Sequence, residues 1–126
     1  MTGMLQVWRL MMNYNQGDIV LVWFPDSNLL TAKKRPAVIL QKNNLQTGID
    51  QVIIGMITSN ILRSGHGSRI FIDINTEIGR KTALLSNSII MTDNIATVQF
   101  KEIYKKIGTF SDIDLLKKSI KYTFDI

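Results

Sequence analysis

Short apolar runs recur along the chain, and polar or glycine-containing stretches separate them. Most of these runs are rich in Ile and Val, and their length favours β-strands over helices. The pattern predicts strands over Ile19–Phe24, Pro36–Leu40, Val52–Ile57, Ile70–Ile74, Ser88–Met91, Ile95–Val98 and Tyr104–Ile107. Trp23 lies inside the first run, so we expect its side chain in the core. Many short strands joined by turn signals are typical of a small barrel or sandwich.

The C-terminal segment has a helical period instead. Its apolar residues recur every three or four positions and would share one helix face: Ile113, Leu116, Ile120 and Phe124. Ser111 and Asp114 have the spacing of a capping box, which makes Ser111 the predicted N-cap. Acidic residues near the start and lysines further along agree with the helix dipole. We expect this helix to cover one face of the sheet.

The polar stretches between the predicted strands are expected to be loops or turns. They cover residues 26–34, 43–50, 60–68 and 75–87. The dipeptide Asp93-Asn94 is a turn signal of the same kind, because both residue types hydrogen-bond their own backbone. It would separate the strand that ends at Met91 from the one that starts at Ile95.

Length and composition predict a single domain. The chain has 126 residues, of which 45% are hydrophobic, enough for a core. No run of about eighteen apolar residues is present, so we expect no membrane-spanning helix. Residues 1–12 lack the features of a signal peptide. We interpret them as a leader from a misassigned start near Met11 or Met12, or as a short extra strand or tail, and we expect the domain over residues 13–126.

The residue types that are missing narrow the chemistry. The chain has no cysteine and a single histidine, His66. Disulfides, a thiolate nucleophile, cysteine-bound zinc and a two-histidine nuclease mechanism are therefore excluded. No metal-ligand spacing, phosphate-binding glycine loop or Ser-His-Asp arrangement is present. We expect no metal and no cofactor, and any catalysis would depend on arginine, hydroxyls and at most one carboxylate.

The charge balance favours a polyanionic partner. The formal net charge is +5, which suits phosphate contacts, although a modest excess of charge also serves solubility. Lys33, Lys34 and Arg35 are contiguous, and Pro36 favours an extended backbone at Arg35. A guanidinium at one strand end and the Thr58 hydroxyl at another could clamp a phosphodiester. The alternative is a surface arginine and a threonine that merely closes its strand.

Two further residues could move protons. His66 lies between two glycines, and its imidazole titrates near neutral pH. Its sequence neighbours give no indication of a group that orients the ring, so an exposed loop histidine is the alternative. Asp93 supplies a carboxylate, with the turn described above as its alternative role.

Five segments of the chain, in order, resemble the MazF/PemK family of bacterial toxins. They are Gly17-Asp18-Ile19-Val20-Leu21-Val22, Lys34-Arg35-Pro36-Ala37-Val38-Ile39-Leu40, Ile57-Thr58-Ser59-Asn60, Ser88-Ile89-Ile90-Met91-Thr92-Asp93-Asn94-Ile95 and Lys106-Ile107-Gly108-Thr109. The resemblance runs from Gly17 to about Leu116. It implies an SH3-like small β-barrel with a C-terminal α-helix that forms a homodimer. It also implies a cytoplasmic, metal-independent endoribonuclease that cuts single-stranded RNA. Such a toxin is silenced by a cognate antitoxin and contacts DNA only through the antitoxin complex.

The resemblance also implies roles for particular residues. Arg35 and Thr58 match the catalytic arginine and the strand-end threonine of the family. RNA contacts are implied for Lys33, Lys34, Ser59 and Asn60, and Asp93 matches an acidic position that some members use. We rank Asp93 above His66 for proton transfer, because only Asp93 falls within a matched segment. The implied reaction is attack by the ribose 2′-hydroxyl on its own phosphate, which gives a 2′,3′-cyclic phosphate and a 5′-hydroxyl.

Two departures from the family pattern leave other functions open. Many members have an arginine where this chain has Ala96, so RNA affinity or sequence choice could differ. The loop over residues 26–34 lacks the glycines and the Glu-Gln that often occur in this RNA-gating, antitoxin-binding segment. The competing hypotheses are a non-catalytic barrel that binds a protein, such as a topoisomerase poison, and a degenerate toxin kept only to bind antitoxin.

Overall fold

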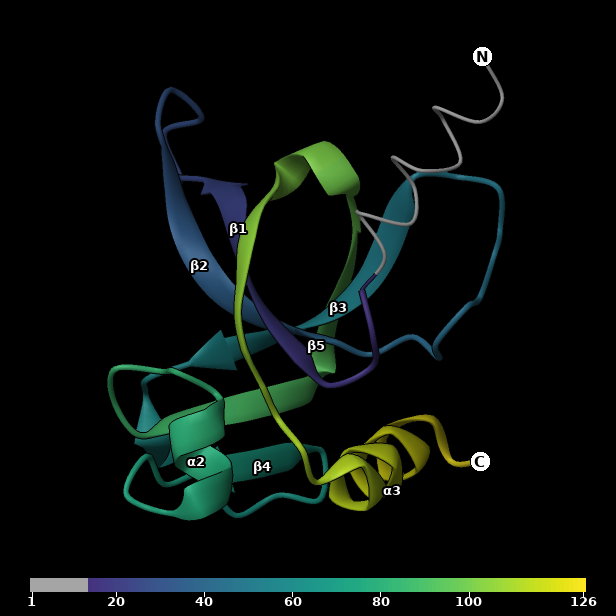
Figure 1. Cartoon of the computed structure of the whole chain (residues 1–126). Coiled ribbons are helices and arrows are strands. Elements are labelled where there is room, and N and C mark those ends of the chain that lie inside the picture. Colours follow the sequence, from purple (N-terminus) through teal and green to yellow (C-terminus); the bar gives the residue numbers. More distant parts are fainter. Residues whose placement is uncertain (1–13) are drawn as a thin grey trace.

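The computed structural model describes residues 14–126, which form one antiparallel six-stranded sheet and a C-terminal helix (Figure 1). The strands are β1 (Asp18–Pro25), β2 (Ala32–Ile39), β3 (Gln51–Thr58), β4 (Arg69–Ile72), β5 (Ser88–Gln99) and β6 (Ile103–Thr109). The helices are α2 (Glu77–Lys81) and α3 (Ile113–Phe124), with 3-10 turns η1 (Ile61–Arg63) and η2 (Phe100–Glu102). The predicted fold class, mainly β with a C-terminal helix, is confirmed.

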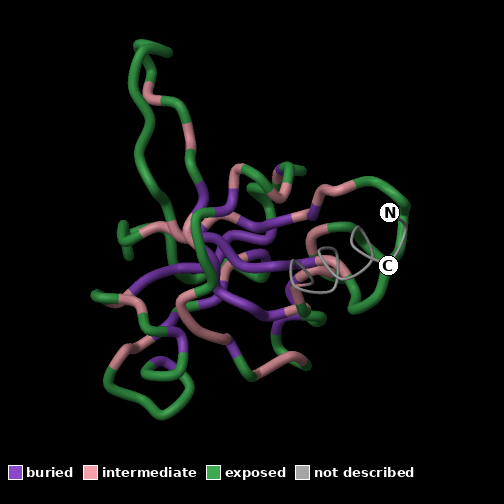
Figure 2. Tube along the Cα trace, turned by 45° about the horizontal axis from the view of Figure 1, so that its top comes forward, coloured by how far each residue is buried: buried purple, intermediate pink, exposed green. Residues whose placement is uncertain are grey.

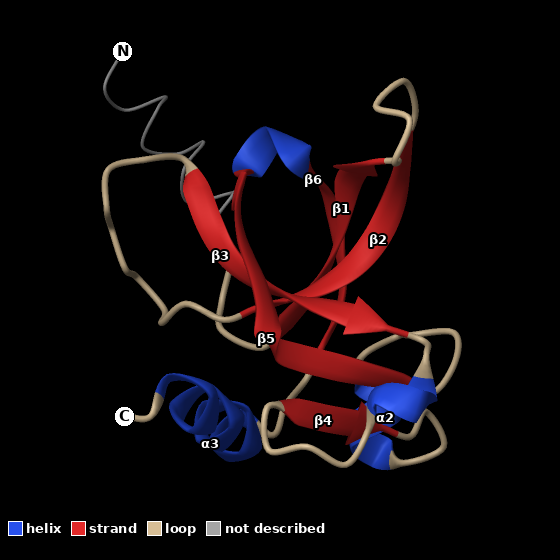
Figure 3. Cartoon of the chain, turned by 180° about the vertical axis from the view of Figure 1, so that it is seen from behind, coloured by secondary structure: helices blue, strands red, loops and turns tan. Residues whose placement is uncertain are grey.

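The sheet has the strand order β4-β5-β3-β2-β1-β6 and curves into a barrel. Figure 3 shows β1, β2, β3, β5 and β6 around one interior, with β4 and α3 below it. Within residues 14–126, no helix has the length and apolarity needed to cross a bilayer. The prediction about residues 1–12 lies outside the described part of the chain.

Two hydrophobic cores hold this arrangement together. The inner core fills the barrel and consists of Val20, Val22, Ala37, Ile39, Val52, Ile54, Val98 and Ile103. The outer core lies between the sheet and α3 and consists of Ile19, Val38, Leu40, Ile57, Ile70, Ile72, Ile90, Phe110 and Leu116. Buried segments accordingly gather where the strands cross (Figure 2). Successive side chains of β1 and β2 alternate between the two cores, which explains why these strands are continuous apolar runs.

β5 is one long strand, where the sequence predicted two strands and a turn. Gly55 pairs with Ile95, and the next residue, Met56, pairs with Met91. The residues between them on β5, Thr92–Asn94, therefore have no partner on β3; we call them the β5 bulge. The Asp93-Asn94 signal thus marks an irregularity inside a strand, and the predicted turn is wrong. A bulge places extra residues on one strand and bends it.

The β5 bulge is tied to α3 by a buried hydroxyl. The Oγ1 of Thr92 lies 2.8 Å from both Ser119 Oγ and Thr123 Oγ1, and it donates to the Ser68 carbonyl over 2.7 Å. Thr92 is fully buried. Buried polar groups are stable only when such partners are present. The bulge therefore fixes α3 against the sheet.

Several local predictions are corrected. Trp23 is 41% exposed, because its position near the end of β1 lies beyond both cores. The N-cap of α3 is Asp112, whose carboxylate accepts from the Leu115 amide, and not Ser111. Lys33 and Lys34 belong to β2 and not to the preceding loop. The segment 75–87, predicted as a loop, contains α2.

Candidate functional site

A basic hollow of about 800 Å³ opens where β2, β3 and β6 meet the segment after α2. All of its charged lining residues are basic: Lys33, Lys34, Arg35, Lys105 and Lys106. Hydroxyls of Thr58, Ser59, Ser86 and Ser88 share the lining, and Leu21, Pro36 and Ile57 are among its apolar residues. Cations and hydroxyls together are suited to phosphate oxygens. Of the residues predicted from sequence, Lys33, Lys34, Arg35, Thr58 and Ser59 come together here.

The strand register indicates how Arg35 and Thr58 come to line the same hollow. β2 and β3 pair as Ile39–Ile54, Val38–Gly55 and Ala37–Met56. The same register, continued past the last pair, sets Arg35 opposite Thr58 and on the same face. The pairing ends at Ala37, so Pro36 has β1 on one side and no β3 partner on the other. A proline without a free N–H is tolerated at such an edge position.

The hydroxyl of Thr58 is oriented by its own chain. Thr58 Oγ1 accepts a hydrogen bond from the backbone N–H of Asn60 over 3.1 Å. Since a hydroxyl has one donor and two acceptor positions, this contact leaves the Thr58 proton free to donate. Asn60 has a further role as the cap of η1, where its side chain accepts from the Leu62 amide. Asn60 therefore positions Thr58 and does not line the hollow.

The cations of the hollow are largely uncompensated. Within residues 14–126 the structure shows ion pairs for Arg69–Asp93, Lys81–Glu77 and Lys106–Asp18. Only the last involves a lining residue, with Lys106 Nζ 3.1 Å from the Asp18 carboxylate. In this part of the chain, Lys33, Lys34, Arg35 and Lys105 have no ion-pair partner. Clustered cations of this kind focus a positive potential and attract a polyanion.

Another wall of the hollow is built by β6 and the segment that follows α2. Gly108 of β6 packs against the end of α2, where a Cβ would collide with the carbonyl oxygens of Lys81 and Thr82. Ala83 follows in the left-handed region at φ 59° and turns the chain toward Ser86 and Ser88. The sequence analysis missed this wall. The Lys105-Lys106 doublet inside an apolar strand was the available signal for two of its cations.

A model of one toxin family matches residues 15–119, described as the "PemK-like, MazF-like toxin of type II toxin-antitoxin system". The chain belongs to this family. The toxin also resembles solved structures over most of its length, at identities that show the fold alone. No curated protein matches it.

Three of these structures illustrate the likeness. The "Mycobacterium tuberculosis toxin MazF-mt6" is 20% identical, with a TM-score of 0.67 over 86% of this chain and 97% of that one. An "endoribonuclease in complex with its cognate antitoxin" from a mycobacterial species is 14% identical, with a TM-score of 0.68 over 90% and 96%. A MazE-MazF structure from Deinococcus radiodurans is 13% identical, with a TM-score of 0.66 over 90% and 97%.

Asp93 of the toxin does not line the basic hollow. Its carboxylate accepts two hydrogen bonds from Arg69, at 2.8 Å and 3.3 Å. These bonds hold the pKa of Asp93 below its ordinary value, the hydrogen bond from Arg69 being the largest cause. The same contact raises the pKa of Arg69. A carboxylate with a lowered pKa is a weak base, so its position and its partner both favour a structural role.

His66 also lies outside the lining, and its ring is oriented. Nδ1 is 2.7 Å from Ser68 Oγ, and the ring meets Tyr122 edge-on with 5.5 Å between centroids. The expectation that nothing orients this ring is therefore wrong. Ala96 pairs with Ile54 and packs against the inner core. The missing arginine at that position thus leaves the lining of the hollow unchanged.

Proposed function

We propose that this toxin is a metal-independent endoribonuclease that cuts single-stranded RNA in the basic hollow. The observation that supports it best is the convergence of Arg35, Thr58 and four lysines in a hollow whose charged lining is entirely basic. Such a lining attracts the phosphates of RNA, and the Arg35 guanidinium can bind one of them. Solved structures that this chain resembles include endoribonucleases, which favours the same reaction class.

In the proposed reaction the ribose 2′-oxygen attacks the adjacent phosphorus and the bond to the 5′-oxygen breaks. The 2′-hydroxyl loses its proton and the leaving 5′-oxygen gains one, which leaves a 2′,3′-cyclic phosphate and a 5′-hydroxyl. Negative charge builds on the phosphoryl oxygens. Arg35 stabilises this charge, and the free proton of the Thr58 hydroxyl donates a second hydrogen bond.

The proposal assigns no proton transfer to Asp93 or His66. Each is held by other side chains outside the hollow. Lys33, Lys34, Lys105 and Ser59 bind the RNA backbone on either side of the cleaved linkage. Because arginine does not give up its proton in proteins, it serves here as a cation and not as a base.

The proposed partners are a cognate antitoxin and a second copy of the chain. Related structures include complexes with antitoxin. In this toxin the β1–β2 loop presents two apolar side chains at its tip, with Leu29 78% and Leu30 88% exposed. Exposed apolar groups beside a functional hollow are suited to a protein that covers it. We place this activity in the bacterial cytoplasm, where antitoxin and mRNA occur together, and we expect contact with DNA only through the antitoxin.

The test combines a chelator, a variant and a modified substrate. Purified toxin is incubated with mixed single-stranded RNA in EDTA, beside Arg35→Ala, and the new ends are mapped. We expect the wild-type toxin to cleave in EDTA and to leave cyclic phosphate ends, and we expect Arg35→Ala to cleave about 10²- to 10³-fold more slowly. A deoxyribose at the mapped cut site removes the nucleophile and should block that cut. RNA that stays intact under all conditions would refute the proposal and favour a non-catalytic binding module or a degenerate toxin.

A further inference from the structure

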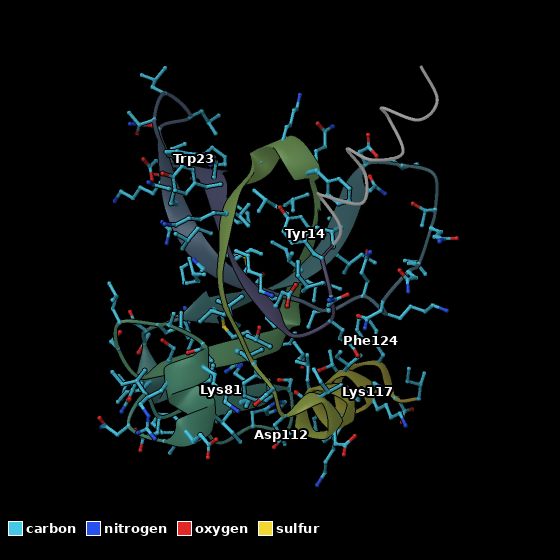
Figure 4. All side chains as sticks on the ribbon, viewed as in Figure 1. Tyr14, Trp23, Lys81, Asp112, Lys117 and Phe124 are labelled. Carbon is cyan, nitrogen blue, oxygen red and sulfur yellow. The ribbon has the colours of Figure 1, made fainter. Side chains whose placement is uncertain are left out.

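Trp23 and Tyr104 form an exposed aromatic pair beside the basic hollow. Their ring centroids are 6.2 Å apart at an interplanar angle of 76°, so the rings meet edge to face. Trp23 is 41% and Tyr104 51% exposed, and neither belongs to the inner or the outer core. Figure 4 shows Trp23 at the β1–β2 end of the barrel, remote from Phe124 on α3. Aromatic rings left this exposed retain faces that a planar ligand can cover.

The aromatic pair is continuous with the hollow through its lysines. The Nζ of Lys34 lies 4.0 Å from the Tyr104 ring centroid and 5.3 Å from that of Trp23. Lys105 Nζ lies 5.7 Å from the Tyr104 centroid. Both lysines also line the hollow. The same cations therefore border the phosphate-binding surface on one side and the aromatic rings on the other.

The strand register sets the direction in which a ligand would run. Trp23 pairs with Lys34 across β1 and β2, so the two side chains share a face. Leu21, two positions earlier on that face, lines the hollow. Arg35 is the residue next to Lys34, about 3.3 Å further along the strand. The Arg35 side chain points to the opposite face from that of Lys34, so the phosphate that lies beside the two rings is one bound at Lys34.

Resting on the proposed function, we propose that Trp23 and Tyr104 stack an unpaired base of the RNA whose phosphate is bound in the basic hollow. Proteins that bind single strands combine basic grooves with aromatic rings on which bases stack. Here the hollow corresponds to the basic groove, and Trp23 and Tyr104 are the aromatic rings. Lys34, held over the rings, pairs with the phosphate of the stacked nucleotide. Because every base has a π-face, this site adds affinity more than sequence choice.

The test measures binding and cleavage separately. Trp8 is the only other tryptophan, so Trp8→Phe makes Trp23 the sole tryptophan reporter. The probe is a short mixed-sequence RNA in which every 2′-hydroxyl is methylated, which prevents cleavage. Its matched control is an abasic oligonucleotide with the same backbone. We expect the RNA to quench Trp23 fluorescence and the abasic strand to leave it unchanged. Cleavage of unmodified RNA by the same protein, measured in parallel, reports the proposed function by itself.

Substitution of the ring supplies the second readout. We expect Trp23→Ala to weaken binding of the methylated RNA about 5- to 150-fold, the range for loss of one stacked base. Trp23→Phe should restore most of it, and Phe124→Ala, which removes another half-exposed ring, should leave it unchanged. Should Trp23→Ala not fold, Trp23→Leu keeps apolar bulk without a π-face and should show the same loss.

Three results would overturn the stacking site. They are binding within twofold of wild type for Trp23→Ala or Trp23→Leu, equal quenching by the abasic strand, and a loss confined to antitoxin binding. Any of them, found with a toxin that still cuts unmodified RNA, removes the stacking site and leaves the proposed function intact. Absence of cleavage by the wild-type toxin instead removes the proposed function.

Discussion

Two Arg–Thr pairs in this toxin have similar chemistry and opposite surroundings. Arg69 and Thr92 lie at the β5 bulge, where Asp93 holds the guanidinium and α3 holds the hydroxyl. Arg35 and Thr58 lie at the basic hollow, where no carboxylate lines the wall. At the bulge the protein satisfies its own polar groups, which stabilises the fold. At the hollow those groups remain available to a ligand. The difference supports a structural role for Arg69 and Thr92 and the proposed catalytic role for Arg35 and Thr58.

The largest expected effect is on cleavage. Arg35→Ala should lower the cleavage rate about 10²- to 10³-fold, because the transition state loses a fixed charged donor. Asp93→Asn should stay within about threefold of wild type, a change of under about 0.7 kcal/mol, because Asp93 lies outside the hollow. Single-turnover cleavage of one RNA with saturating toxin measures both. A loss in Asp93→Asn as large as that in Arg35→Ala would remove the distinction between the two pairs.

The two threonines should divide stability from activity. Thr92→Val removes a buried hydroxyl and leaves Ser119, Thr123 and the Ser68 carbonyl short of a partner, so the free energy of unfolding should fall by about 1–3 kcal/mol. Thr58→Val should change it by no more than about 0.5 kcal/mol, since Thr58 closes an open strand end. Urea denaturation followed by circular dichroism measures the stability.

Cleavage assays on the same two variants complete the comparison. Thr58→Val should slow cleavage, because the hydrogen bond to the phosphoryl oxygen is lost. Thr92→Val, assayed at a temperature where it is folded, should cut RNA at the wild-type rate. If Thr58→Val cut RNA at the wild-type rate and folded Thr92→Val did not, the proposed division of roles between the two threonines would be wrong.

The smallest expected effect concerns Arg69 and depends on pH. In the folded toxin the pKa of Asp93 lies below its ordinary value, chiefly because Arg69 donates a hydrogen bond to it. A lowered folded-state pKa stabilises the protein above the unfolded pKa, and this contribution is lost as the pH falls through the folded value. Arg69→Ala should therefore be less stable than wild type at neutral pH, by less than Thr92→Val, and the gap should close in acid. The urea midpoints of wild type and Arg69→Ala, measured from neutral pH down into acid, give this stability difference. A difference that grows in acid would contradict the stabilising pairing of Arg69 with Asp93.

The sequence predicted the parts of this fold that depend on local pattern. Alternation of β1 and β2 between two cores leaves a continuous apolar run, and α3 leaves a helical stripe that includes the buried Leu116. Both Arg35 and Thr58 were predicted at strand ends; Thr58 does end β3, but Arg35 lies inside β2, which begins at Ala32. The family resemblance joined the two residues. The register that brings them together could not be read from either strand alone.

What the sequence missed depends on contacts between distant segments. Trp23 continues an apolar run past the point where the cores end, so the pattern of hydrophobic residues could not predict that its side chain is exposed. The dipeptide Asp93-Asn94 is compatible with a bulge as well as with a turn, so the sequence alone could not distinguish the two. The segment after α2 can pack against β6 only because Gly108, far along the chain, has no side chain. A Cβ there would collide with the carbonyl oxygens of Lys81 and Thr82. Only the folded sheet shows that Lys105 and Lys106 complete the hollow.

The place of Arg35 and Thr58 just beyond the last β2–β3 pair limits how this protein can be controlled. That ladder packs against both cores, so the positions of Arg35 and Thr58 in the hollow are set when the sheet folds. A mutation that displaces Arg35 and Thr58 by disrupting the β2–β3 pairing would also destabilise the barrel. Under the proposed function, we expect reversible control to come from a molecule that covers the opening of the hollow while the barrel beneath it stays folded.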